Sequence, residues 1–275
     1  MTDIRIPRPV YCSTWHLHHN LTVARDICAG RFTHAGTTVT ISGQPDWTRP
    51  DLRAVSDWWA EWVEFPYTLD LAFAFHKTGD PRYLYKWKRL VGSWAADMAP
   101  DFGPVDAVAR RVQNWLYSWV ALEDSLSFIP LEPIIRDTIA ESISRQAKHL
   151  LGQVARSGYR RTAHLSALLV VALALPDAPG ADGLREYAWP ELQRSVLADF
   201  DPNGRHRERT GHHSAIALRS LLAARENARR FGLPVDPGFE HRLKSALDFS
   251  LHVPVPRLPV VAAPPHTMYA GEWQS

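Results

Sequence analysis

Cysteine and long apolar runs are both scarce in this chain, and their scarcity excludes several classes of protein. Only Cys12 and Cys28 occur among 275 residues, which is too few for a disulfide framework and forms no zinc motif. The longest apolar run, LSALLVVALAL (165–175), is too short to span a bilayer, and the opening MTDIRIPRPVYC lacks the apolar core of a secretion signal. We therefore expect a cytoplasmic protein with no membrane partner.

A strong excess of charge of one sign is also missing. Lys and Arg number 31 against 29 Asp and Glu, so the formal net charge is only +2. A dedicated nucleic-acid-binding protein carries a larger and more clustered basic charge. The balance suits an acidic ligand, and we expect no nucleic-acid partner.

The alternation typical of β-strands is nearly absent. It is convincing only in THAGTTVTISG, residues 33–43, where it predicts a minor β-hairpin. Elsewhere apolar residues recur at helical spacing, which predicts an all-α protein. The predicted helices cover 16–29, 52–63, 67–78, 81–97, 105–124, 131–156, 160–175, 185–198, 212–231 and 237–252.

Two joints between these helices share a pattern of Gly, Asp and Pro. AFAFHKTGDPRYLYKWKRLVGSW and AARENARRFGLPVDPGFEHRLKSALDF both run helix, Gly turn, Asp-Pro and second helix. Such recurrence predicts stacked helical hairpins, arranged as a solenoid or as a ring. We expect one helical domain over 1–252 and an irregular, proline-rich tail over 253–275.

Tryptophan, in contrast, is abundant, with eleven residues. Two interpretations stay open for the set in the first half of the chain. Each ring can pack in the core, or the set can line a cleft with flat platforms on which sugars stack. The residues concerned are Trp58, Trp59, Trp62, Trp87, Trp94, Trp115 and Trp119.

The start of the apolar helix 160–175 carries polar residues that could do chemistry. Arg160 and His164 are four residues apart and therefore share one helix face, directly after Tyr159. An anion bound at this helix N-terminus would satisfy both the dipole and the basic side chains, whereas simple solvation of these residues is the alternative.

The stretch DPNGRHRERTGHHSA, residues 201–215, is the second polar candidate. His206, His212 and His213 lack the spacing of a zinc-binding helix, and no cysteine accompanies them, so we expect no metal. A histidine among arginines at the mouth of a helix can serve as general base or acid on an anionic substrate. A solvated helix entry capped by Thr210 is the competing interpretation.

Several stretches, in order, resemble the heparinase II/III-like family of polysaccharide lyases, in particular its alginate lyase-like N-terminal helical toroid. They are GRFTHAGTTVTI, FPYTLDLAFAFHKTGDPRYL, RRVQNWLYSWVAL, ALLVVALALP and DPNGRHRERTGHHSAIALRSLLAARENARRFGLP. The resemblance covers roughly residues 20–252 and implies an incomplete (α/α) toroid. In the family a β-sandwich follows the toroid, and we expect this chain to be a truncated form without it.

The resemblance also implies a reaction, β-elimination on an acidic polysaccharide that contains uronic acid. The sugar carboxylate must be neutralised, a base must take the C5 proton, and an acid must protonate the leaving oxygen. No cofactor is implied. The family uses an Asn-His pair and a tyrosine for this chemistry, and here Tyr159 and Arg160 align with the pair while His213 aligns with the tyrosine.

The implied roles follow from this alignment. His213 is expected to act as general base or acid with Tyr159 as its proton-transfer partner, and Arg160 or His164 is expected to bind the carboxylate. A shifted alignment would place Ala163 and His164 at the Asn-His pair. The residues expected to bind substrate are Asn114, Trp115, His206, Glu208 and His212.

Two other functions stay open at this stage. The same basic cleft could bind carbohydrate without cleaving it, and the helical hairpins could form a scaffold for protein partners. We also expect self-association through apolar residues exposed at the cleft rim.

Overall fold

The structure is a computed structural model that describes residues 6–13, 20–125, 129–208 and 210–252. The predicted tail over 253–275 and the first part of the predicted helix 16–29 lie outside these residues. Within the described ranges, no helix is both long enough and apolar enough to cross a membrane.

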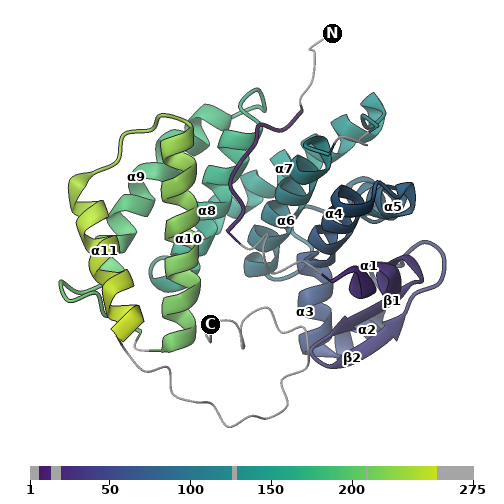
Figure 1. Cartoon of the computed structure of the whole chain (residues 1–275), viewed down its shortest axis with the longest axis horizontal. Helices are drawn as coiled ribbons and strands as arrows, with labels where there is room; N and C mark the ends of the chain where they lie inside the picture. The colour runs from purple at the N-terminus through teal and green to yellow at the C-terminus, as the bar shows by residue number, and fades with distance from the viewer. Residues whose placement is uncertain (1–5, 14–19, 126–128, 209, 253–275) are drawn as a thin grey trace.

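Helical hairpins packed side by side form an open arc in two layers (Figure 1). The inner layer consists of α4 (Tyr67–Thr78), α6 (Val105–Glu123), α8 (Gly158–Ala174) and α10 (Gly211–Arg230), each packed on the next. The outer layer consists of α5 (Pro81–Asp97), α7 (Pro133–Gly152), α9 (Ala181–Asp199) and α11 (Pro237–His252). The predicted all-α incomplete toroid is confirmed.

Smaller elements cover one end of the arc. A hairpin of β1 (Arg31–His34) and antiparallel β2 (Thr37–Thr40) packs with α1 (Leu21–Cys28), and confirms the strand prediction around 33–43. The short α2 (Pro50–Ala54) and α3 (Ser56–Glu64) follow. This end and α11 lie on opposite sides of the molecule in Figure 1.

The prediction of one helix over 52–63 is wrong, because the chain breaks at Val55 (φ −95°, ψ 78°) between α2 and α3. On one continuous helix Leu52 and Trp58 would lie about 120° apart around the axis, at the two edges of any shared face. Both side chains are nevertheless buried in the core. The break turns α3 so that both side chains reach the interior.

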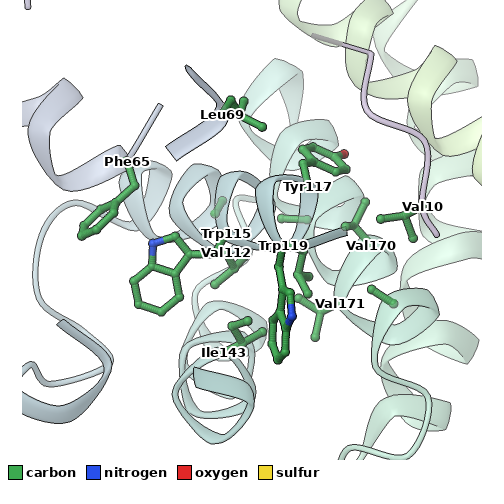
Figure 2. Close-up of a cluster of buried hydrophobic side chains, with 14 of the residues drawn as sticks. Val10, Phe65, Leu69, Val112, Trp115, Tyr117, Trp119, Ile143, Val170 and Val171 are labelled. Carbon is green, nitrogen blue, oxygen red and sulfur yellow. The ribbon is translucent and has the colours of Figure 1, made fainter. Parts of the chain in front are cut away.

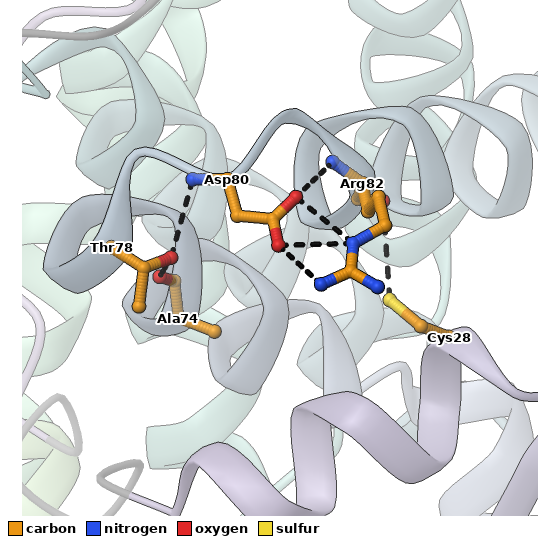
Figure 3. A network of polar contacts seen from close by, with 5 residues as sticks. All are labelled: Cys28, Ala74, Thr78, Asp80 and Arg82. Carbon is orange, nitrogen blue, oxygen red and sulfur yellow. Dashed lines mark hydrogen bonds and ion pairs between the residues drawn. The ribbon is translucent and has the colours of Figure 1, made fainter.

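The joint between α4 and α5 shows why the Gly-Asp-Pro pattern marks a hairpin. Gly79 ends α4 with φ 67°, and the Asp80 carboxylate accepts a hydrogen bond of 3.0 Å from the Arg82 backbone N–H at the start of α5 (Figure 3). The joint between α10 and α11 repeats this chemistry. There Gly232 also has φ 67°, and Asp236 accepts from the Phe239 N–H at 3.1 Å.

Of the two interpretations of the tryptophan set, core packing is correct for most of its members, and these rings are not sugar-stacking platforms. The six rings with no exposed surface are Trp58, Trp62, Trp87, Trp94, Trp115 and Trp119. Trp62 stacks between Trp47 and Trp58, and Trp115 meets Phe65 edge to face at 5.3 Å (Figure 2). Helical spacing places these rings on a shared face, but that face packs inward as the aromatic core.

A buried arginine joins the end of α3 to this core. Arg111 on α6 has no exposed surface; its Nη1 donates to the Val63 carbonyl at 3.0 Å and its Nη2 to the Phe102 carbonyl at 3.2 Å. Its Nε donates to Gln146 Oε1 on α7 at 2.6 Å, and the guanidinium lies 4.4 Å from the Trp94 ring centroid. Burial lowers the pKa of Arg111 to about 9, so the group stays charged at neutral pH.

Replacing Arg111 tests this junction. Arg111→Met leaves the buried Val63 carbonyl and the partly buried Phe102 carbonyl without their donors, so we expect the free energy of unfolding to fall by about 3 kcal/mol. Urea denaturation measures the change, and the exposed α5 residue provides the control Arg89→Met, with a change within about 0.5 kcal/mol. If both variants lost the same free energy of unfolding, Arg111 would not stabilise this junction.

Candidate functional site

A pocket of about 210 Å³ opens on the inner layer, between α6, α8 and α10 and beside the end of α3. Its charged and aromatic lining residues are Glu64, Asp106, Arg110, Tyr117, Tyr159, Arg160, His164, His212 and Arg219. Three arginines and two histidines line the pocket together with two carboxyl groups. The excess of basic groups suits an anionic ligand.

His164 contacts protein groups through both of its ring nitrogens. Its Nε2 lies 2.7 Å from Asp106 Oδ1, and its Nδ1 accepts a hydrogen bond of 3.2 Å from the Ala155 backbone N–H. A backbone N–H can only donate, so both ring nitrogens of His164 are engaged within the protein. The hydrogen bond from His164 is the largest cause that lowers the pKa of Asp106; Arg160 adds to this shift and burial opposes it. His164 thus stabilises the ionised form of Asp106.

Tyr159 and His213 come from helices far apart in the sequence and stack on one another. Their ring centroids lie 4.1 Å apart with an interplanar angle of 17°. Arg160 Nε donates to the Tyr159 hydroxyl at 3.3 Å and lies 3.2 Å from Asp106 Oδ2. Tyr159 and Arg160 line the pocket, whereas His213 lies against Tyr159 and outside the lining.

Glu208 is held against the start of α8, beside His213. Its Oε2 lies 2.8 Å from His213 Nδ1, without the alignment of a hydrogen bond. A Cβ on Gly158 would lie 1.9 Å from Glu208 Oε1, and Gly158 has φ 76°. Only glycine therefore permits both this backbone turn and the close approach of the carboxylate. Asp199 accepts from the Gly158 N–H at 3.2 Å and completes the start of the helix.

The remaining predicted binding residues divide into two groups. Asn114 and His212 line the pocket; burial, followed by repulsion from neighbouring cations, lowers the pKa of His212. His206 and Trp115 do not line it. His206 is buried with its ring edge against Phe200, and its Nδ1 accepts from the Glu208 N–H at 3.2 Å.

Sequence reasoning missed several residues of this pocket. Asp106 and Arg110 were missed, although they precede the predicted Asn114 at intervals of four residues on α6, and this spacing could have placed all three on one face. Arg219 on α10 and Glu64 at the end of α3 carried no such signal, because only the tertiary packing brings them to the pocket. Among the described residues, no cluster of three or more His, Cys, Asp or Glu side chains could hold a metal ion.

Of the two carboxyl groups in the pocket, that of Glu64 has the larger pKa shift. Its side chain is 14% exposed and lies 3.5 Å from Arg110 Nε. Burial raises its pKa to about 7; Arg110 opposes this shift, and the carboxylates of Glu61 and Asp106 add to it. Glu64 is thus substantially protonated at neutral pH, while Asp106 in the same pocket is ionised.

The two layers of helical hairpins define the class as an incomplete (α/α) toroid. The family described as Heparinase II/III N-terminus matches residues 31–265. The chain belongs to that family.

Solved structures agree with this assignment at the level of the fold. The heparan sulfate lyase HepC from Pedobacter heparinus superposes with a TM-score of 0.70 at 16% identity, over 90% of this chain and 39% of that one. A structure of heparinase III gives a TM-score of 0.67 at 16% identity, over 90% and 40%. This chain thus spans about two fifths of the length of these proteins. No curated protein sequence matches it.

The raised pKa of Glu64 predicts a pH-dependent stability. A carboxyl group with pKa 4.5 when unfolded and about 7 when folded binds a proton on folding, so its contribution weakens as pH rises between those values. Because glutamine does not titrate, Glu64→Gln does not lose this stability as the pH rises. Relative to the wild type, the variant should gain up to about 3 kcal/mol of unfolding free energy between about pH 4 and pH 8.

Urea denaturation across this pH range measures the gain. Asp57→Asn, which removes an exposed carboxylate from the first turn of α3, is the matched control. A difference between Glu64→Gln and the wild type that does not change with pH would show that Glu64 titrates normally.

Proposed function

We propose that this chain is the toroid of a lyase that cleaves acidic, uronate-containing polysaccharides by β-elimination. The stacking of His213 on Tyr159 at the edge of a pocket rich in arginine carries the proposal. Membership of the heparinase II/III N-terminal family supports it. The names heparan sulfate lyase and heparinase III, borne by structures with the same fold, favour a glycosaminoglycan as substrate.

The pocket offers groups for binding the acidic sugar. Arg160 is exposed and in contact with Asp106, so its guanidinium can turn to a substrate carboxylate and form a bidentate pair. Arg110 and Arg219, on the facing helices, supply further positive charge. Neutralising the carboxylate makes the C5 proton more acidic, which is the first requirement of the elimination.

The Tyr159–His213 pair supplies proton transfer. Tyr159 presents its ring to the pocket, with the hydroxyl accepting a hydrogen bond from Arg160, and His213 lies against its face beside Glu208. A histidine is suited to take a proton near neutral pH. We assign the removal of the C5 proton to this pair, with His213 as the base.

A second candidate function is carbohydrate binding without cleavage. The observation that favours it is the position of His213, which lies outside the pocket lining. In that case the arginines bind the polymer and no proton is removed.

Variants of the stacked pair separate the two candidates. With heparan sulfate, chondroitin, hyaluronan and alginate as substrates, the new double bond is followed by its ultraviolet absorbance. We expect His213→Ala and Tyr159→Phe each to lower kcat about 100-fold or more. His241→Ala, on the exposed surface of α11, is the control and should retain activity.

Full activity of His213→Ala would refute its assignment as the base. If the wild type forms no product from any of these polymers and calorimetry still detects binding, the noncatalytic function is correct.

A further inference from the structure

The end of α3 is built to hold one side chain, Glu64, in the pocket. The last carbonyls of a helix have no partner within the helix. Here the Val63 carbonyl accepts from Arg111 and the Glu64 carbonyl accepts from Asn114 Nδ2 at 2.8 Å, both on α6. Phe65 then leaves the helix with φ 63°, a left-handed conformation that is unfavourable for a residue with a bulky side chain.

These contacts fix the backbone of Glu64 from both sides. The Phe65 ring has no exposed surface and packs edge to face on Trp94 and Trp115, which keeps the left-handed turn in place. The carboxyl group of Glu64 is therefore directed to the pocket and cannot withdraw from it by a change of backbone conformation. Asn114 acts here as a positioning residue through its amide.

We propose that Glu64 is the general acid that protonates the leaving glycosidic oxygen, an inference that rests on the lyase function proposed above. The base takes the C5 proton, and the electron pair of that C–H bond forms the C4=C5 double bond. The C4–O bond breaks, and its oxygen takes the proton from the Glu64 carboxyl group. Glu64 is left as a carboxylate beside Arg110, and a proton from water restores it.

The two carboxylates of the pocket have environments suited to different roles. Asp106 receives a hydrogen bond from His164 and an ion pair from Arg160, which stabilise its ionised form. Glu64 is more deeply buried and lies at the C-terminal end of α3, where the helix dipole also disfavours a negative charge. Such a separation of pKa values within one site is how paired carboxylates divide acid and base work.

Other ionisable groups surround Glu64 and contribute to its titration. They are Glu61 on α3, Asp106, Arg110 and Arg111 on α6, Arg160 and His164 on α8, and His212 and Arg219 on α10. The arginines remain charged across the pH range of interest. Deprotonation of Glu64 is therefore the change that removes a proton donor as the pH rises through about 7.

A comparison of leaving groups tests the proposal. A natural polymer needs its leaving oxygen protonated, whereas a 4-deoxy-4-fluorohexuronate glycoside loses fluoride with little need of an acid. We expect Glu64→Gln to lower kcat on the polymer about 100-fold or more, and to change it less than about threefold on the fluoride. Asp57→Asn, on the exposed start of the same helix, should leave both rates unchanged.

The wild type gives a second measurement that does not depend on the folding of a variant. Its kcat on the polymer should fall as the pH rises through about 7, and its kcat on the fluoride should not. The assignment would be overturned if Glu64→Gln lowered kcat equally on both substrates. It would also be overturned if the kcat of the wild type fell in the same way on both substrates as the pH rises through about 7. If the wild type cleaves polymer and Glu64→Gln cleaves it equally well, the lyase function stands and the role of Glu64 fails. A wild type without activity on any uronate refutes both.

Discussion

The hydrogen bonds of one buried cation, Arg111, are the constraint on which the geometry of the pocket depends. A guanidinium without solvent must find its acceptors within the protein, and here they are carbonyls of two segments and a glutamine of the outer layer. The interaction therefore joins α3, α6 and α7. Together with the Asn114 amide, this buried group holds the end of α3 at the pocket.

The pocket shows how a cationic site can still contain acid groups. Asp106 is ionised and engages His164 and Arg160, so part of the positive charge is already compensated. With a pKa of about 7, Glu64 carries only part of its negative charge at neutral pH and therefore repels an anionic ligand less than a solvated glutamate would. Under the proposed mechanism, the burial of this residue would serve both the binding of the ligand and the donation of a proton.

The sequence predicted the helices well and the site only in part. Apolar periodicity, which is a local property, placed the predicted helices 67–78 and 81–97 on α4 and α5 with the same bounds. The tryptophans stayed open to two interpretations, because spacing shows which rings share a face and not whether that face points inward. Tyr159 and His213 were chosen through a resemblance between sequences; the structure stacks their rings, and their catalytic role stays a prediction. Glu64 was not found, because its burial depends on the packing of α3 on α6.

The protonation state of Glu64 in the folded protein is the most direct test of this account. The chemical shift of its carboxyl carbon can be followed by NMR as the pH changes, with Glu64→Gln used to assign the signal. A midpoint at about pH 7 is expected if the end of α3 holds the carboxyl group in the pocket as described. A midpoint near 4.5, the value of a solvated glutamate, would contradict the account.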